Sequence, residues 1–260
     1  DRILVGRDDE HGGVIVEMES EQRLDLDPRL FSSLLKASIS RWRQQGKKGI
    51  WIKVPIELVG LVQAAVEEGF YFHHAEPAYL MLVRWLADTP NTLPANASHR
   101  VGIGAFVFDE NNQLLVVQEK SGRFRGSGVW KIPTGVVDQG EDICDAAVRE
   151  VKEETGIDAK FLELLAFRQS HRAYFDKSDL FFVCLLEPLS FDIHPQEAEI
   201  EAAQWMAYEE YAAQAFNQKS KILQLLAEVC EARRNNRYSG FSAVSTSADY
   251  SKGGSHLYLD

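Results

Sequence analysis

Three glutamates within one short segment have the spacing of a site for a hard metal ion. Glu150, Glu153 and Glu154 are three and four residues apart, which places their carboxylates on one face of a helix. A helix gains nothing from like charges held so close, but a divalent cation relieves their repulsion. Mg²⁺ and Mn²⁺ prefer such oxygen ligands. The spacing predicts a divalent-metal site, and the alternative is the solvated acidic face of a surface helix.

The segment that carries these glutamates has the pattern of an amphipathic helix. Residues 142–155 contain no Gly or Pro and are rich in Ala, Val and Glu, which favours a helix. Gly156 stands where a left-handed helix end is expected. Ile143, Ala147 and Val151 recur at every fourth position and predict an apolar stripe that faces a core.

Residues on both sides of the helix start predict how it is held. Gly135 and Gly140 would allow a tight loop that brings a backbone carbonyl oxygen toward the metal. We expect the carbonyl of Gly135 to be a further ligand. Glu141 and Arg149 are expected to form an ion pair that braces the loop against the helix rather than to take part in chemistry.

The complete segment reads Gly135, five residues, Glu141, seven residues, Arg149-Glu150-Val151, Lys152, Glu153-Glu154, Thr155, Gly156-Ile157. Every fixed position of the Nudix box is present, so the chain resembles the Nudix hydrolases. The resemblance implies hydrolysis of a pyrophosphate bond, with Mg²⁺ or Mn²⁺ held by Glu150, Glu153 and Glu154. One glutamate must deprotonate the attacking water. This base is either in the box or in a later loop, where Glu197 and Glu199 are candidates and an exposed loop acid is the alternative.

Further segments resemble a plant subfamily of Nudix hydrolases over nearly the whole chain. They are Gly126–Lys131, Ala166–His171, Glu199–Ala203 and Tyr238–Ser242. Members of this subfamily hydrolyse ADP-ribose and NADH to AMP plus ribose 5-phosphate or reduced nicotinamide mononucleotide, and the resemblance implies this activity here. The Ser-Gln-Pro-Trp-Pro-type segment of dedicated NADH pyrophosphatases is absent. Other diphosphates remain alternatives: sugar nucleotides, oxidised nucleotides, isoprenoid diphosphates and diphosphoinositols. A non-catalytic nucleotide-binding regulator is a third hypothesis, which the intact carboxylates oppose.

Substrate contacts are expected near the box. An aromatic side chain would stack on the base, and cations would contact phosphate or ribose; the alternatives are ordinary packing and exposed charge. We predict substrate contacts for Phe124, Lys131, Arg168 and His171. Further candidates are Tyr174 and Phe175 for stacking and Arg123 and Arg125 for phosphate or ribose.

The chain is expected to contain two α/β domains joined by a linker. Asp88–Ser98, with two prolines, has linker composition and separates residues 1–87 from a domain at 99–237 and a tail at 238–260. The first part predicts strands at 13–17, 49–54 and 79–85 and helices at 28–45, with Asp27 as N-cap, and 56–68. Lys48–Trp85 resembles the acetyltransferase-like domain that precedes the Nudix domain in the same subfamily.

Two features of this first part limit its chemistry. Arg43, Gly46 and Gly49 miss the spacing of an acetyl-CoA-binding turn by one residue, so acetyl transfer is not expected. His73 and His74 are adjacent, and in a regular strand they would face opposite ways, which argues against a metal pair.

The second part has the element pattern of a Nudix α/β/α sandwich. Expected strands span residues 101–108, 113–118, 129–132, 161–168, 180–186 and 201–206. Helices are expected at 142–155 and 219–234, and the tail from Tyr238, rich in Ser, Gly and Tyr, is expected to be poorly ordered.

Composition excludes several classes of protein. The 260 residues are 45% hydrophobic and carry a net charge of −11, which argues against non-specific nucleic-acid binding. No apolar run has membrane-spanning length. Cys144, Cys184 and Cys230 lack paired spacing, so free thiols in a reducing compartment are expected. The chain begins with Asp1, so the lack of a targeting segment supports a cytoplasmic location only weakly. Expected partners are a small-molecule nucleotide and, by the family resemblance, a second copy of the chain.

Overall fold

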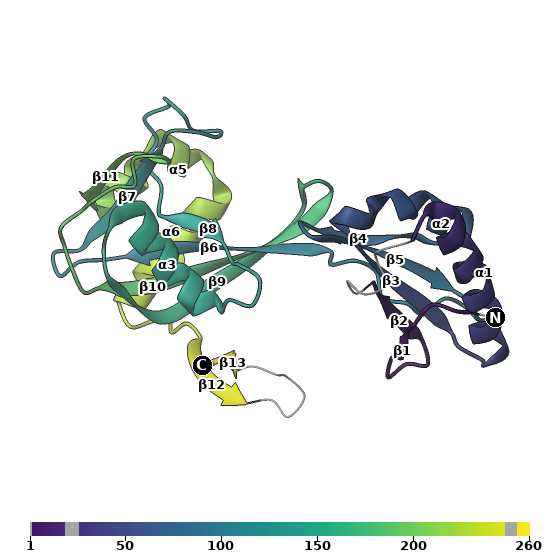
Figure 1. Cartoon of the computed structure of the whole chain (residues 1–260). Coiled ribbons are helices and arrows are strands. Elements are labelled where there is room, and N and C mark those ends of the chain that lie inside the picture. The colour runs from purple at the N-terminus through teal and green to yellow at the C-terminus, as the bar shows by residue number, and fades with distance from the viewer. Residues whose placement is uncertain (1, 19–25, 248–253) are drawn as a thin grey trace. The chain divides into compact units, whose positions relative to one another are not determined.

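A computed structural model describes residues 2–18, 26–247 and 254–260. The chain divides into two compact units, Asp1–Ala97 and Ser98–Asp260 (Figure 1). The boundary falls at the end of the segment with linker composition. Each unit has its own sheet and its own apolar core, so each is described by itself.

The first unit is a five-stranded sheet covered by helices. Its strands are β1 (Arg7–Asp8), β2 (Val14–Glu17), β3 (Gly49–Pro55), β4 (Tyr71–Glu76) and β5 (Tyr79–Trp85), in the order β1-β2-β3-β5-β4. Only β2 and β3 run parallel. The helices are α1 (Pro28–Gln44), the 3₁₀ helix η2 (Ile56–Leu61) and α2 (Val62–Glu67).

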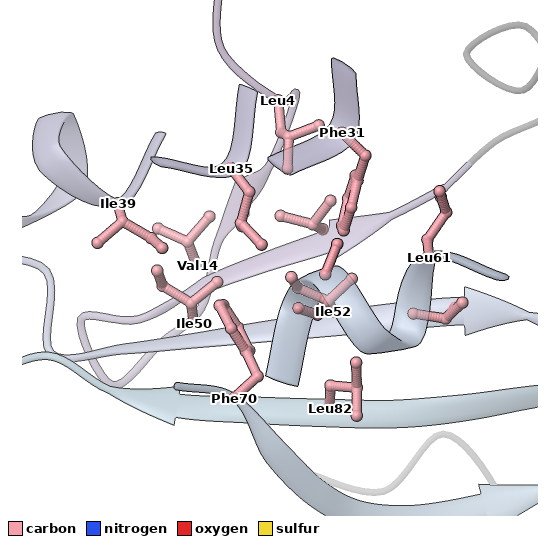
Figure 2. Packing of buried hydrophobic residues seen from close by; sticks show 14 of the residues in the cluster. Leu4, Val14, Phe31, Leu35, Ile39, Ile50, Ile52, Leu61, Phe70 and Leu82 are labelled. Atoms are coloured by element: carbon pink, nitrogen blue, oxygen red, sulfur yellow. The ribbon is translucent and has the colours of Figure 1, made fainter. Parts of the chain in front are cut away.

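The predicted start of α1 is confirmed. The Asp27 carboxylate accepts hydrogen bonds from the amides of Arg29 and Leu30 at 2.8 Å, which satisfies two amides of the first turn that have no partner within the helix. Phe31 and Leu35 of this helix are fully buried against Ile50, Ile52 and Leu82 of the sheet (Figure 2). Burial of such side chains contributes about 1.5–3 kcal/mol each.

Two expectations for the first unit are wrong. The helix expected at 56–68 is divided into η2 and α2, with non-helical backbone at Leu58 (φ −107°, ψ 17°). Strand β4 was not expected, and a register shift lies between Phe72 and His74. Because a bulge interrupts the alternation of side chains, His73 and His74 do not diverge, and their Nδ1 atoms lie 2.7 Å apart.

The second unit has a four-stranded sheet in the order β8-β6-β10-β9. These strands are β8 (Thr134–Val136), β6 (His99–Val107), β10 (Lys177–Pro188) and β9 (Ala159–Tyr174). Strands β6 and β10 run parallel, and the other neighbours are antiparallel. A separate antiparallel pair contains β7 (Gln113–Glu119) and β11 (Ile200–Ala207). The helices are α3 (Ile143–Thr155), α4 (Tyr208–Ala213), α5 (Ala215–Lys219) and α6 (Lys221–Arg234).

Two apolar clusters make this unit a three-layer structure. Ile103 and Ala105 of β6 belong to the cluster that contains Ala147 and Val151 of α3. Phe106, which points to the opposite face of the same strand, belongs to the cluster that contains Cys230 of α6. Helices therefore cover both faces of the sheet, and the predicted α/β/α sandwich is confirmed.

The strand expected at residues 129–132 is absent from this described region. Only an isolated bridge between Val117 and Lys131 forms there, and the strand that follows is β8. The Gln214 side chain explains the difference, because it accepts from the Trp130 amide at 2.8 Å and donates to the Trp130 carbonyl at 3.0 Å. A side chain far along the chain thus satisfies the backbone groups that a neighbouring strand would have bonded.

The expectation of a poorly ordered tail is wrong for its described residues; positions 248–253 lie outside them. Strands β12 (Ser242–Ser247) and β13 (Gly254–Leu259) form an antiparallel hairpin. The amides and carbonyls of Phe241 and Leu164 exchange hydrogen bonds of 2.9 Å, which join the tail to β9. Among the described residues, no helix is long and apolar enough to cross a membrane.

Candidate active site

Helix α3 ends at the glycine that the sequence predicts. Gly156 is left-handed (φ 76°), and its amide donates to the Lys152 carbonyl. A Cβ at this position would lie 2.9 Å from Cβ of His194, so a side chain would meet the loop before β11 as well as backbone strain. Gly156 therefore fixes both the end of α3 and the loop packed beside it.

Arg149 is the centre of the ion pairs on this helix. Its Nε and Nη2 atoms donate to the two carboxylate oxygens of Glu141 at 2.7 and 2.8 Å, and Nη2 also donates to the Val136 carbonyl at 2.9 Å. These bonds join α3 to the segment from β8, as expected for a brace. Hydrogen bonding from Arg149 lowers the pKa of Glu141, so this carboxylate stays charged at neutral pH.

The same guanidinium also binds two of the three glutamates that are predicted to be metal ligands. Its Nη1 atom donates to Glu150 at 2.8 Å and to Glu153 at 3.0 Å. The Glu150 side chain is 14% exposed, whereas that of Glu153 is 51% exposed. Burial raises the pKa of Glu150, and Arg149 offsets part of this effect. The hydrogen bond and the positive charge of Arg149 thus favour the ionised form of Glu150.

Gly135 makes room for Glu150. A methyl group at this position would overlap the Glu150 carboxyl group. Gly135 lies within β8, paired with Ile103 of β6, and is not a left-handed turn residue. The expected tight loop at Gly135 is therefore wrong, because the glycine is needed for the close approach of a carboxylate. Gly140, by contrast, is left-handed (φ 81°).

Glu154 is the most deeply buried of the three glutamates. It is 6% exposed, and its Oε2 atom has no hydrogen-bond partner. Burial raises its pKa to about 8; Lys131 opposes this shift, and Glu150 and Glu119 add to it. Water normally solvates an ionised carboxylate, and burial without a partner is costly. The alternative of a solvated acidic helix face is therefore wrong for Glu154.

Lys131 lies in this cluster as the partner of Glu119, with which it forms an ion pair. Glu119 ends β7, and the bridge between Val117 and Lys131 brings the two residues together. Sequence reasoning missed Glu119, because only the pairing of β7 with a distant loop shows its place. The cluster therefore contains five carboxylates, of Glu119, Glu141, Glu150, Glu153 and Glu154, and two cations, of Arg149 and Lys131.

The donor set fits a hard cation, although the side chains are not gathered around one. No three His, Cys, Asp or Glu side chains among the described residues are close enough together to hold a metal ion, since Arg149 holds two of the glutamates. Two observations favour a cation at this place: the unpartnered Oε2 of Glu154 and the space at Gly135 that Glu150 fills. Glu150, Glu153, Glu154 and the Gly135 carbonyl would hold it, a role that stays a prediction.

The loop with Glu197 and Glu199 packs against the end of α3. The amides of His194 and Gln196 donate to the carbonyls of Thr155 and Glu154 at 2.8 and 3.2 Å. The amide of Lys120 donates to the Glu199 carbonyl at 2.7 Å. The backbone of this loop thus lies beside the glutamate cluster, while the side chain of Glu199 is exposed. Its role as the base stays a prediction.

The remaining predicted substrate residues lie on two other segments. Phe124 is half-buried in the loop after β7, edge-on to Phe216 with ring centroids 4.8 Å apart. Arg168 and His171 are exposed on β9, where His171 Nδ1 lies 2.9 Å from the Ser178 hydroxyl. Tyr174 and Phe175 form the end of the same β9–β10 hairpin, and no described contact joins these residues to the glutamates.

A cavity of about 460 Å³ in this unit lies elsewhere. Its lining includes Phe108, Leu186, Phe191 and Arg233 and none of the predicted site residues. Phe108 follows β6, five residues beyond Ile103, which pairs with Gly135; this is about 17 Å along an extended strand. The charge arrangement on α3, rather than cavity volume, identifies the candidate site.

Comparison with known proteins agrees with the box on α3. Residues 98–226 match a family model described as NUDIX domain, and residues 4–86 match one described as Nudix hydrolase domain. The acetyltransferase likeness of the first unit stays a prediction.

Nudix hydrolase 2 of Arabidopsis thaliana is 57% identical over 99% of this chain and 91% of that protein. Nudix hydrolase 10 of the same plant is 51% identical over 99% and 90%. A Mus musculus protein, nucleoside diphosphate-linked moiety X motif 6, is 40% identical over 80% and 67%. The chain belongs to the Nudix hydrolase family.

Proposed function

We propose that the protein hydrolyses the pyrophosphate bond of nucleoside diphosphate derivatives, with ADP-ribose and NADH as substrates and AMP as one product. The observation that carries the proposal is the buried carboxylate of Glu154, whose Oε2 atom has no hydrogen-bond partner, close to the charge of Glu150. An exposed acidic helix would not contain it. The sequence resemblance to the plant subfamily that hydrolyses these two substrates supports the choice of substrate.

The acidic and the basic residues of the site would have different roles. Mg²⁺ or Mn²⁺, when bound, would neutralise phosphate oxygens and acidify a water molecule. Glu150, Glu153 and Glu154 would hold the cation, and Arg149 keeps the first two of these in place. Lys131 supplies a positive charge beside Glu154 that suits a phosphate oxygen. Glu199 would accept a proton from the attacking water, and the box glutamates are the alternative base.

A substrate panel tests the proposal. Purified protein is incubated with ADP-ribose, NADH, a sugar nucleotide, an oxidised nucleoside triphosphate, an isoprenoid diphosphate and a diphosphoinositol. Each is assayed with Mg²⁺, with Mn²⁺ and with chelator, and the products are separated. We expect metal-dependent release of AMP from ADP-ribose and NADH, and loss of at least about 100-fold in turnover in Glu154→Gln.

Other outcomes would decide between the remaining hypotheses. Release of inorganic phosphate, or of a monophosphate without a nucleoside, would replace the proposed substrate by another diphosphate. Binding of ADP-ribose without turnover under every metal condition would favour a regulatory protein and contradict the proposal. The homodimer and the cytoplasmic location expected from the sequence stay predictions, and sedimentation of the purified chain tests the first.

A further inference from the structure

The first turn of α3 has an unusual cap. Asp142 is the N-cap residue, with extended backbone (φ −79°, ψ 149°), but its side chain accepts no hydrogen bond from the helix. The first amides of a helix have no acceptor within it, and the N-cap side chain normally bonds the second or third of them. The second residue here is Cys144, and its amide donates to the hydroxyl of Tyr258 at 3.1 Å. A residue 114 positions away therefore replaces the local cap.

The reason lies in the strand that carries Tyr258. His256 is two residues earlier on β13, so its side chain lies on the same side of the strand. Its Nδ1 atom is 2.9 Å from Oδ2 of Asp142. The carboxylate that could cap the helix thus faces His256, and Tyr258 takes its place at the amide. Both side chains of the hairpin meet the helix at its first turn.

Tyr258 is also packed into the core beneath α3. Its ring contacts the apolar cluster that contains Ala146, Ala147 and Val151, and it lies edge-on to Phe161 with centroids 6.3 Å apart. Burial raises the pKa of Tyr258, so its hydroxyl stays neutral and can accept from the amide. The contact is therefore held by packing on one side and by a hydrogen bond on the other.

We infer that Tyr258 is a positioning residue: the β12–β13 hairpin fixes the first turn of α3, and through it the brace that holds Glu150 and Glu153. Asp142 directly follows Glu141 in the chain. Glu141 accepts two bonds from Arg149, at 2.7 and 2.8 Å, and Arg149 in turn donates to Glu150 and Glu153. A first turn that opens carries Glu141 away from Arg149, and the glutamates lose their common partner.

This inference rests on the proposed function only where metal binding is the readout. Tyr258→Phe keeps the ring and removes the hydroxyl. Tyr238→Phe is a matched control, because the Tyr238 hydroxyl also anchors the tail, but it donates to the Leu165 carbonyl on β9 at 2.5 Å and does not touch α3. Hydrogen exchange of residues 142–146 is measured in the metal-free full chain, and Mn²⁺ affinity is measured by titration.

We expect Tyr258→Phe to speed exchange in residues 142–146 about three- to tenfold, the scale of a lost helix cap, and to weaken Mn²⁺ binding by a similar factor. In Tyr238→Phe, exchange in residues 142–146 and Mn²⁺ affinity should equal those of the wild type.

Two results would overturn the inference. The first is unchanged exchange at residues 142–146 in Tyr258→Phe, which would show that the hydroxyl does not hold the first turn. The second is faster exchange with unchanged Mn²⁺ affinity, which would show that the first turn does not position the glutamates. If the wild type binds no Mn²⁺ at all, the proposed function fails and with it the second half of the inference, whereas the exchange data still decide the first half.

Discussion

Glu154→Gln should stabilise the metal-free protein while it abolishes activity. In the folded chain the pKa of Glu154 is raised to about 8, chiefly by burial, whereas an unfolded chain has a glutamate pKa near 4.3. The folded state therefore binds a proton that the unfolded state releases. Protonated Glu154 therefore makes its full contribution to the stability of the folded state below about pH 4. This contribution is lost as the pH rises to about 8.

The size of the effect follows from the shift. Each unit of pKa corresponds to about 1.4 kcal/mol, and Glu154 is 6% exposed, so solvent screens it little. Wild type should lose roughly 3–5 kcal/mol of stability between pH 4.5 and pH 8.5 through this group alone. A glutamine does not ionise, so Glu154→Gln escapes this loss. The two proteins should have equal stability at pH 4.5 and differ most at pH 8.5.

Urea unfolding in the presence of chelator measures the difference at several pH values. Hydrogen exchange of peptides from residues 26–86 provides an internal reference, because the substitution lies in the other unit. Glu153→Gln is the matched control, since the Glu153 side chain is 51% exposed and no comparable gain is expected. Equal pH dependence for wild type and Glu154→Gln would refute the reasoning, because it would show that Glu154 is solvated.

Three further predictions concern the same site. Gly135→Ala should displace the Glu150 carboxylate and weaken Mn²⁺ binding at least about tenfold, while the urea midpoint changes little, because a flexible side-chain end can move; unchanged affinity in a Mn²⁺ titration would contradict this. Arg149→Ala should cost about 2–4 kcal/mol in urea unfolding, since it removes several charge-assisted hydrogen bonds. Lys152→Ala, which breaks an exposed pair with Asp158, should cost less than about 1 kcal/mol, and equal costs would argue against the brace. Glu153→Gln should lower kcat at least about 100-fold without loss of fold, and near-normal turnover would remove Glu153 from the ligand set.

Features set by neighbours in the chain could be predicted from the sequence. The extent of α3, its end at Gly156 and the pair of Glu141 with Arg149 all depend on spacing within one helix and one loop. The cap of α1 at Asp27 is equally local. Periodicity also separates the two faces of β6, since alternate residues face different clusters. In each case the physical cause acts over a few residues.

Features set by distant parts of the chain could not be predicted in this way. Gln214 bonds both backbone groups of Trp130, so a strand pattern at 129–132 does not become a strand. Because of the bulge in β4, the side chains of His73 and His74 lie together instead of pointing to opposite faces of the strand. Tyr258 lies in a polar segment whose composition suggests disorder, yet it is packed against α3. The composition of a segment indicates its behaviour in isolation, but it does not show which distant residues pack against that segment.

The same distinction explains why the glutamate spacing was open to two interpretations. Spacing alone permits a solvated acidic face, in which each carboxylate meets water. The structure instead places Glu154 in the interior and Glu150 against Gly135. The cluster then contains five carboxylates but only two cationic side chains, those of Arg149 and Lys131. Arg149 donates hydrogen bonds to three of the five carboxylates. The resulting negative charge is costly where water is excluded, and an added divalent cation would offset it. Burial of the third glutamate, rather than the number of acids, is what favours a metal site over a charged surface.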